Sequence, residues 1–453
     1  MIKELDINPK DRIYFVHIPK TGGTSFRDIV ANFLPTFKLY RDINELEFGL
    51  TTEHKTEIEN AAVLYGHKYY ELVRAYPGAI TFTFLRNPIS RSVSQFNQFR
   101  KEDSTYTSLS EMITGKPGRF SSLQTLFVGA HFVNSSSPFT IEDSFIFGNW
   151  EFINQVEVTL ENAKINLAEM NSFGIMERYE DSMSLIAFKF GWRPFKKVPR
   201  ENVSGGKSLR VEDISKDEYS ALSTLCQDDI ALYDYGVELF EENFTEMKQK
   251  LFEYYGSQHN INSVEQLDDE NLRFALLETH YEQRFAKRNR ENVTEIILDL
   301  TETKKIRPQR IAYESFNWRG WHAPGKRGRW TGPENEASID LPLKTLEPLK
   351  IEINVLRGIN KDVLANFRFL VNGQLMKETK YVQEKKWGRI YEYIIDPIML
   401  ATEKPFTRFT FETDLTLPPK EVNDKRKLGL MVASIKIQKY QPEQVDINEA
   451  QGK

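Results

Sequence analysis

Two short loops carry residues whose types and spacing suit the binding of phosphate or sulfate. The first loop, His17–Ser25, has the sequence HIPKTGGTS. Its two glycines allow the backbone to approach an anion closely, and the free N–H groups of a following helix would point at that anion. A lysine and several hydroxyl groups add a positive charge and further donors. The predicted anion cradle consists of Lys20, Thr21, Gly22, Gly23, Thr24 and Ser25.

The second loop, Leu85–Ser94, has the sequence LRNPISRSVS and places an arginine at the end of a strand-like run. Asn87 is a good N-cap and Pro88 suits the first helical position, so Ser94 falls two turns into the predicted helix. The guanidinium of Arg86 can form bidentate, charge-assisted bonds, and with Ser94 it could clamp a second phosphate. Two cradles of this kind suit one nucleotide with phosphates at both ends.

Neither loop is a Walker A loop, in which the lysine follows the glycines and a terminal hydroxyl holds magnesium. Lys20 precedes the glycines instead. The segment Ser204–Ser208, SGGKS, ends like a Walker loop, but Glu201 occupies the place of the required first glycine. Lys207 in this segment could close over a bound cofactor or be an ordinary solvated loop lysine.

Each of the two loops joins a predicted strand to a predicted helix. The first unit combines a strand at Arg12–Ile18 with a helix at Ser25–Leu34, and the second begins with a strand at Ala79–Leu85. Repeated strand-loop-helix units imply a parallel sheet flanked by helices. We therefore expect an α/β domain over residues 1–256. Further predicted elements are helices at 153–170 and 183–190 with a strand at 173–176 between them.

The rest of the chain has a different pattern. Residues 257–293, rich in charge with scattered Leu and Phe, predict an exposed helical linker. Residues 294–440 contain short apolar runs separated by turn residues, including the hairpin signal Asn372–Gly373, and this pattern predicts an all-β antiparallel sandwich. The polar tail 441–453 is expected to be frayed.

The predicted sandwich holds four of the six tryptophans of the chain. Aromatic rings beside basic groups can stack on sugars and grip an acidic or sulfated polysaccharide, whereas tryptophans in a sandwich commonly form its core. Both interpretations stay open from the sequence. The residues concerned are Trp318, Trp321, Trp330 and Trp387, with the interleaved basic residues Arg319, Lys326, Arg327 and Arg329.

Composition excludes several classes of protein. Sixty basic and 65 acidic residues give a net charge of -5, so no global positive field exists to hold nucleic acid. Cys226 is the only cysteine, which excludes internal disulfides and cysteine-based zinc sites. The charged start of the chain does not resemble a signal peptide, and no apolar run is long enough to span a membrane. We therefore expect a cytoplasmic protein.

The two loops together resemble the paired signatures of sulfotransferases that use 3'-phosphoadenosine 5'-phosphosulfate, PAPS. Within that superfamily the chain is most similar to the carbohydrate type, which includes heparan sulfate 2-O-sulfotransferase and its bacterial relatives. The resemblance covers about residues 10–250 and implies the P-loop-like sulfotransferase fold for this part. Supporting matches are Tyr65–His67, Leu123–Thr125, Gly174–Arg178 and Asp229–Tyr233.

The resemblance implies a role for each of the matching residues. Lys20–Ser25 would bind the 5'-phosphosulfate, with Lys20 also stabilising charge on the bridging oxygen, while Arg86 and Ser94 would hold the 3'-phosphate. The Tyr65–His67 match makes His67 the candidate general base, a task that suits the ordinary pKa of histidine. The implied reaction needs no metal, and the implied acceptor is a carbohydrate: an oligosaccharide, a glycolipid or a polysaccharide.

Some alternatives stay open at this point. His17 and Glu177 are rival candidates for the general base, and Arg91 could face solvent. A nucleotide-dependent kinase is the enzymatic alternative, and a glycan-binding protein with an inactive sulfotransferase-like domain is the non-catalytic one. The sequence does not determine the oligomeric state.

Overall fold

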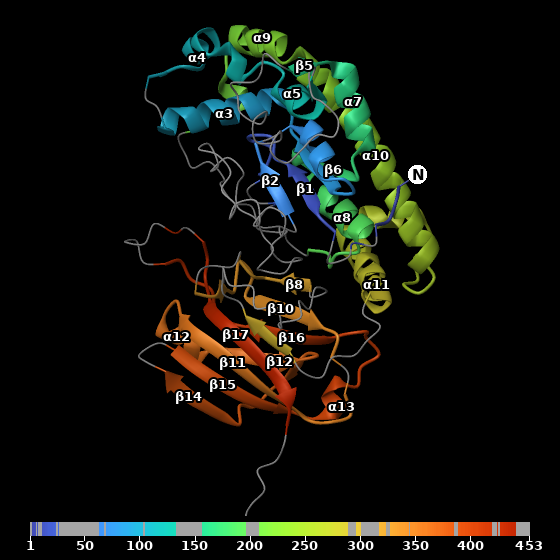
Figure 1. The fold of residues 1–453 in the computed structure, drawn as a ribbon, viewed down its shortest axis with the longest axis vertical. Coiled ribbons are helices and arrows are strands. Elements are labelled where there is room, and N and C mark those ends of the chain that lie inside the picture. The colour runs from blue at the N-terminus through green and yellow to red at the C-terminus, as the bar shows by residue number, and fades with distance from the viewer. Residues whose placement is uncertain are drawn as a thin grey trace, which may run out of the picture. The chain divides into compact units, whose positions relative to one another are not determined.

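The computed structural model describes residues 2–5, 7, 11–23, 26, 63–67, 69–102, 105–132, 156–195, 208–288, 296–299, 317–322, 327–343, 345–384, 388–418, 424 and 426–440. These residues fall into two compact units, which divide between Arg284 and Phe285. Helices surround parallel strands in the first unit, and strands dominate the second (Figure 1). Within the described part of the chain, no helix is long and apolar enough to cross a membrane.

The first unit is built on a parallel sheet, as predicted. Its strands run in the order β2 (Val63–Gly66), β1 (Ile13–Val16), β3 (Ile80–Leu85) and β6 (Ser172–Ile175), and each neighbouring pair is parallel. Every residue of β1, β3 and β6 is buried. Continuous burial of this kind is typical of strands that are covered on both faces.

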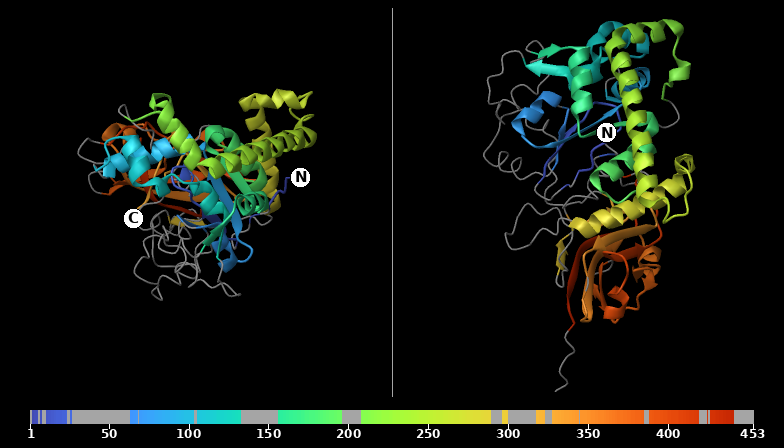
Figure 2. Two further views of the ribbon diagram at one scale, coloured as in Figure 1. Left: turned by 90° about the horizontal axis from the view of Figure 1, so that it is seen from above. Right: turned by 90° about the vertical axis from the view of Figure 1, so that its right-hand side faces the viewer.

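Helices cover this sheet and follow its strands. The entry to α3 is built as the sequence predicts, because the Asn87 side chain accepts a hydrogen bond from the Ser90 N–H at 3.0 Å and Pro88 is the first helical residue. The longest helix, α10, runs along one side of the unit (Figure 2). The predicted helix at 25–34 lies outside the described residues, apart from Phe26. The helices are α3 (Pro88–Glu102), α4 (Leu109–Gly115), α5 (Leu123–Gly129), α7 (Leu160–Glu169), α8 (Tyr179–Phe190), α9 (Lys216–Leu225), α10 (Gln227–Tyr255) and α11 (Glu270–Arg288).

Short elements complete the first unit. The antiparallel pair β4 (Ala130–Phe132) and β5 (Val156–Val158) stands apart from the main sheet. Short 3-10 helices connect the longer elements: η3 (Tyr70–Ala75), η4 (Pro117–Arg119), η6 (Met176–Arg178), η7 (Val211–Asp213) and η8 (Val264–Asp268).

The charge-rich segment after residue 257 is helical, but it is not the exposed linker that its composition predicts. In α11, Leu276 and Leu277 are at most 2% exposed and belong to the core cluster of the first unit. His280 is also buried, with Nε2 at 3.1 Å from the Phe188 carbonyl. The charges of α11 lie around an apolar stripe at helical spacing, so the helix packs as part of the α/β unit.

The second unit is an antiparallel sandwich, as predicted. One sheet has the strand order β13-β12-β16-β10-β8 and the other β14-β15-β11-β17-β7, with β9 paired to β17. Its apolar core draws on both sheets, for example Ile339 and Phe411 from one and Ile353 and Ile435 from the other. The strands are β7 (Ile296–Asp299), β8 (Asn317–Arg319), β9 (Arg329–Trp330), β10 (Glu336–Leu341), β11 (Leu349–Gly358), β12 (Arg368–Val371), β13 (Gln374–Leu375), β14 (Lys380–Glu384), β15 (Gly388–Ile395), β16 (Thr407–Glu412) and β17 (Leu430–Lys439), with short helices α12 (Lys361–Ala365) and α13 (Pro397–Leu400).

The Asn-Gly hairpin signal is confirmed. Asn372 and Gly373 join β12 to β13 with φ angles of 51° and 81°. Both residues therefore lie in the left-handed region, which a two-residue hairpin turn of type I′ requires and which Asn and Gly adopt most easily.

The three described tryptophans of the sandwich are core residues rather than an exposed platform. Trp318, Trp321 and Trp330 are 5%, 2% and 7% exposed. The guanidinium of Arg329 is buried over the ring of Trp318, 4.9 Å from its centroid, and donates to the His322 carbonyl. These three rings cannot stack on a sugar from solvent. Trp387 and Lys326 lie outside the described residues, and glycan binding by this unit stays a prediction.

Candidate active site

The two predicted loops meet at the carboxyl edge of the parallel sheet. β1 and β3 are hydrogen-bonded neighbours, so the residues that follow them emerge side by side. Arg86, directly after β3, donates from Nη1 to the carbonyl oxygen of Lys20 at 3.0 Å. The carboxyl ends of parallel strands are where open α/β sheets bind their ligands. The structure therefore brings both candidate anion loops into one site.

The first loop is tightly folded between its neighbours. Lys20 and Gly22 have positive φ angles of 69° and 89°. The Thr21 hydroxyl donates its hydrogen bond to the Ile18 carbonyl at 2.9 Å. This buried residue could therefore bind an anion through its backbone N–H but not through its hydroxyl. Helical structure begins at Gly23, and Phe26 N–H donates to the Gly22 carbonyl at 3.3 Å. The turn thus places Gly22 directly before Gly23, the residue at which helical structure begins.

Gly23 is required because no space exists for a side chain there. A Cβ at this position would lie 2.0 Å from Cδ2 of His17. We expect Gly23→Ala to lower the free energy of unfolding by about 1–3 kcal/mol, because the imidazole of His17 must move to relieve the overlap. Urea denaturation monitored by circular dichroism measures this change. Gly118→Ala is the matched control, since a Cβ at Gly118 meets nothing within 4 Å; equal losses in both variants would contradict the steric explanation.

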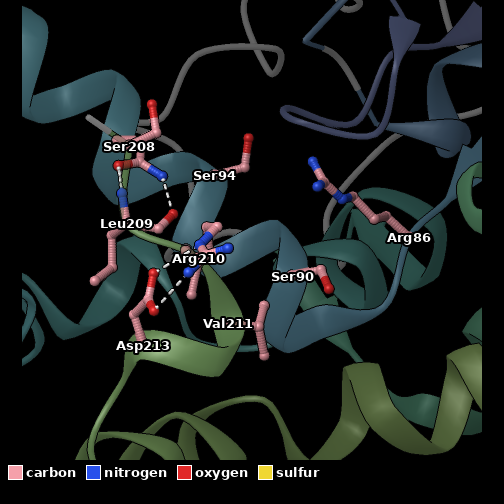
Figure 3. Close-up of a pocket in the computed structure, with 10 residues that line it drawn as sticks. Arg86, Ser90, Ser94, Ser208, Leu209, Arg210, Val211 and Asp213 are labelled. Carbon is pink, nitrogen blue, oxygen red and sulfur yellow. Dashed lines mark hydrogen bonds and ion pairs between the residues drawn. The ribbon is translucent and has the colours of Figure 1, made fainter. Parts of the chain in front are cut away.

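A pocket of about 640 Å³ lies beside the second loop. Its lining includes Arg86 and Ser94, the two residues predicted to hold a phosphate, and Ser90 from the same helix α3. The guanidinium of Arg86 and the hydroxyls of Ser94 and Ser208 point towards the same side of this pocket (Figure 3). The volume is within the range of pockets that hold small ligands.

The opposite wall of the pocket comes from residues 208–211 and Asp213, of which the motif analysis had named Ser208 alone. Asn97 of α3 holds this wall through two hydrogen bonds with the backbone of Leu209, at 2.8 and 2.9 Å. Arg210 adds a second guanidinium to the lining, and Asp213 binds it at 2.9 and 3.0 Å. No local sequence motif surrounds Arg210, so its place in the pocket becomes visible only in the folded structure. Lys207, predicted to close over the site, lies just outside the described residues.

The environment of Arg86 leaves its charge partly desolvated. Burial lowers the pKa of its guanidinium, and the carboxylate of Glu177 opposes that shift. Glu177 itself accepts from the Asn87 N–H at 3.0 Å and from the Tyr233 hydroxyl at 3.1 Å. One oxygen therefore holds the start of α3 and the other accepts from Tyr233 of α10, which favours a structural role for Glu177 over its role as a rival base.

His67 lies at the end of β2, next to the first loop. Its Nδ1 is 2.9 Å from the carbonyl oxygen of His17, and the two imidazole rings are 4.6 Å apart. A carbonyl oxygen can only accept a hydrogen bond, so Nδ1 carries the proton and Nε2 of the neutral ring keeps a free lone pair. The half-buried His67 is thus held in the tautomer that a general base needs.

Other predicted residues have mixed outcomes. Thr24 and Ser25 lie outside the described residues. Arg91 does not face solvent: it is 0% exposed, and burial lowers its pKa while Asp229 opposes the shift. Within the described chain, no cluster of His, Cys, Asp and Glu could hold a metal ion.

Comparison with known proteins places this site in a family. The model of the Sulfotransferase family matches residues 3–236, which is just over half of the chain. The match includes both loops and His67. It ends within α10, before the antiparallel sandwich begins.

Curated relatives carry heparan-sulfate names. The chain is 24% identical over 292 residues to heparan-sulfate 6-O-sulfotransferase 3 of Mus musculus, covering 54% of this chain and 61% of the relative. It is 24% identical over 297 residues to heparan-sulfate 6-O-sulfotransferase 2 of Gallus gallus, covering 55% and 72%. The alignment thus spans less than two thirds of the mouse protein. The names of these relatives specify the 6-O position, whereas the sequence analysis named a 2-O enzyme as an example of the carbohydrate type.

Among solved structures, the chain is similar to a sulfotransferase from Alicyclobacillus acidocaldarius. It shares 13% sequence identity, with a TM-score of 0.27, over 49% of this chain and 93% of that chain. At this TM-score the comparison adds nothing to the fold described above.

Proposed function

Because this chain belongs to the Sulfotransferase family, we propose that it transfers the sulfuryl group of PAPS to a hydroxyl group of a carbohydrate. The observation that carries this proposal is the contact between Arg86 and the Lys20 carbonyl, which joins the two anion loops into one site. A nucleotide with a phosphate at each end needs two such loops within reach of each other. The heparan-sulfate names of the relatives support a carbohydrate acceptor.

The residues present fit a nucleotide of this kind. The turn at Gly22 and Gly23 supplies backbone N–H groups at a helix N-terminus for the 5'-phosphosulfate. Arg86 and Ser94 line the neighbouring pocket and would hold the 3'-phosphate. Arg210 adds a positive charge to this pocket. Its ion pair with Asp213 partly neutralises that charge, so Arg210 would attract a phosphate less strongly than Arg86.

His67 is the proposed general base for the acceptor hydroxyl. In the proposed step, a bond forms between the acceptor oxygen and sulfur while the bond from sulfur to the bridging phosphate oxygen breaks. The acceptor proton moves to Nε2 of His67, and Lys20 stabilises the negative charge that develops on the leaving phosphate. The products are a sulfate ester and 3'-phosphoadenosine 5'-phosphate, PAP. The chain itself contributes binding, orientation and movement of the proton.

An acceptor-dependent assay tests this proposal. Purified protein is incubated with PAPS and a panel of carbohydrates that includes N-sulfated heparosan, chondroitin and neutral oligosaccharides. PAP release is measured by chromatography, and the sulfate ester is identified by mass spectrometry. We expect release of PAP only when an acceptor is present. Consumption of ATP in a parallel incubation with ATP and magnesium, without turnover of PAPS, would indicate a kinase. Carbohydrate binding without any turnover would indicate a non-catalytic glycan-binding protein.

A further inference from the structure

Gln124, the first-turn glutamine of α5, forms a two-point clamp on the backbone of Arg86. The Arg86 N–H donates to Oε1 of Gln124 at 2.9 Å, and Nε2 of Gln124 donates to the Arg86 carbonyl at 2.8 Å. Arg86 lies one residue beyond β3, where the ladder with β6 has ended at Leu85 and Ile175. A carboxamide has the same donor and acceptor as a peptide group, so Gln124 acts here as one more residue of a neighbouring strand.

We propose that Gln124 is a positioning residue for the candidate phosphate arginine. By fixing both backbone groups of Arg86, the clamp sets the direction in which its guanidinium enters the pocket. Without the clamp, the backbone N–H and carbonyl of Arg86 would lose both hydrogen bonds. The backbone dihedral angles of Arg86 would then be less restricted. This inference rests on the proposed function, because it assumes that Arg86 holds the 3'-phosphate.

A buried carboxylate holds Gln124 in turn. Asp229 of α10 is 0% exposed and accepts hydrogen bonds from the backbone N–H groups of Gln124 and Thr125, at 3.0 and 2.7 Å. The hydroxyl of Thr125 donates to the same carboxylate at 2.9 Å. These N–H groups belong to the first turn of α5, where no carbonyl within the helix can pair with them. Asp229 therefore fixes the start of α5, and with it the backbone of Gln124 whose side chain forms the clamp.

Arg91 supplies the charge that balances Asp229 in this buried cluster. Its guanidinium is fully buried, and none of its three nitrogens forms a hydrogen bond within the described chain. The positive charge of Arg91 is attracted by Asp229 and repelled by Arg86. Burial raises the pKa of Asp229, and the positive charge of Arg91 together with the hydrogen bonds from Gln124 and Thr125 opposes that shift.

The test separates positioning from general stability by comparing two nucleotides. Isothermal titration calorimetry measures Kd for PAP, which carries a 3'-phosphate, and for AMP, which does not. In Gln124→Met, which keeps the length of the side chain but removes both hydrogen bonds, we expect the preference for PAP over AMP to fall by about tenfold. AMP affinity should change by less than about twofold, because the first loop is untouched. If Gln124→Met does not fold, Gln124→Glu is the second variant. It keeps the acceptor for the Arg86 N–H but sets a carboxylate oxygen against the Arg86 carbonyl, so the preference should also fall by about tenfold.

Asn171 offers a matched control at the opposite end of the same strand. Its side-chain Oδ1 accepts from the Thr81 N–H at 2.8 Å, so Asn171→Leu also removes an amide-to-backbone bond from β3. We expect Asn171→Leu to lower thermal stability and leave the PAP preference unchanged. An unchanged preference in the folded glutamine variants, or equal losses for PAP and AMP, would overturn the positioning role. Failure of the unmodified protein to prefer PAP would instead overturn the proposed function itself.

Discussion

Replacing His67 with asparagine is expected to lower kcat for sulfuryl transfer by about 100- to 10,000-fold, because it removes the general base. The Nδ2 group of asparagine can take the place of Nδ1 and keep the hydrogen bond to the His17 carbonyl, which spans 2.9 Å in the structure. The fold and the nucleotide site should therefore remain intact. Steady-state rates of PAP release, together with calorimetric titration of PAP, measure both effects. The Kd for PAP should change by less than about twofold, because Arg86 and the first loop are unaltered.

Two further variants make this prediction specific. His17→Asn tests the rival base on the first loop, and His259→Asn is a control, since His259 bonds Thr279 at 2.8 Å on α11. We expect His67→Asn to have by far the largest loss of kcat. Nearly full activity in His67→Asn would exclude His67 as the base, and a parallel loss of PAP affinity would mean that its role is in binding.

Replacing Arg86 with alanine is expected to weaken PAP binding by about 100-fold. This estimate follows from the loss of charge-assisted hydrogen bonds to a phosphate, which contribute about 1.5–3 kcal/mol each. AMP has no 3'-phosphate, so its affinity should fall by less than about threefold, and that smaller loss reflects the contact with the Lys20 carbonyl. Calorimetric titration of both nucleotides measures the two effects separately.

Arg100→Ala is the control for a general loss of positive charge. Arg100 lies at the exposed end of α3, contacts the ring of Phe96 and is not among the residues that line the pocket. The Arg100→Ala variant should bind both nucleotides as the unmodified protein does. If Arg86→Ala weakens PAP and AMP by the same factor, Arg86 organises the loops but does not hold the 3'-phosphate.

The sequence predicts well those features that local chemistry determines. The capped entry of α3 at Asn87 and the Asn372–Gly373 turn follow from the backbone preferences of single residues. The parallel sheet follows from apolar runs that are long enough for strands and are each followed by a helix. The candidate anion loops could also be located, because glycine, lysine and hydroxyl residues cluster within a few positions.

Features that depend on distant contacts could not be predicted. Gln124 and Asp229 belong to segments that match the family, but nothing in those segments shows that one clamps Arg86 and the other anchors the clamp. The partners are 38 and 105 residues apart in the sequence. The burial of Arg91 has the same origin, because its charged and polar neighbours, Asp229 and Cys226, come from the junction of α9 and α10. In α11, abundant charge hides the apolar stripe that packs on the first unit.

The most direct test of the account is a calorimetric titration of the purified protein with PAP, performed with and without magnesium, beside a titration with ATP and magnesium. We predict that PAP binds independently of magnesium and at least about tenfold more tightly than ATP, because two anion loops hold its two phosphates. Binding of ATP only with magnesium, and no binding of PAP, would contradict the proposed sulfotransferase site and favour a kinase.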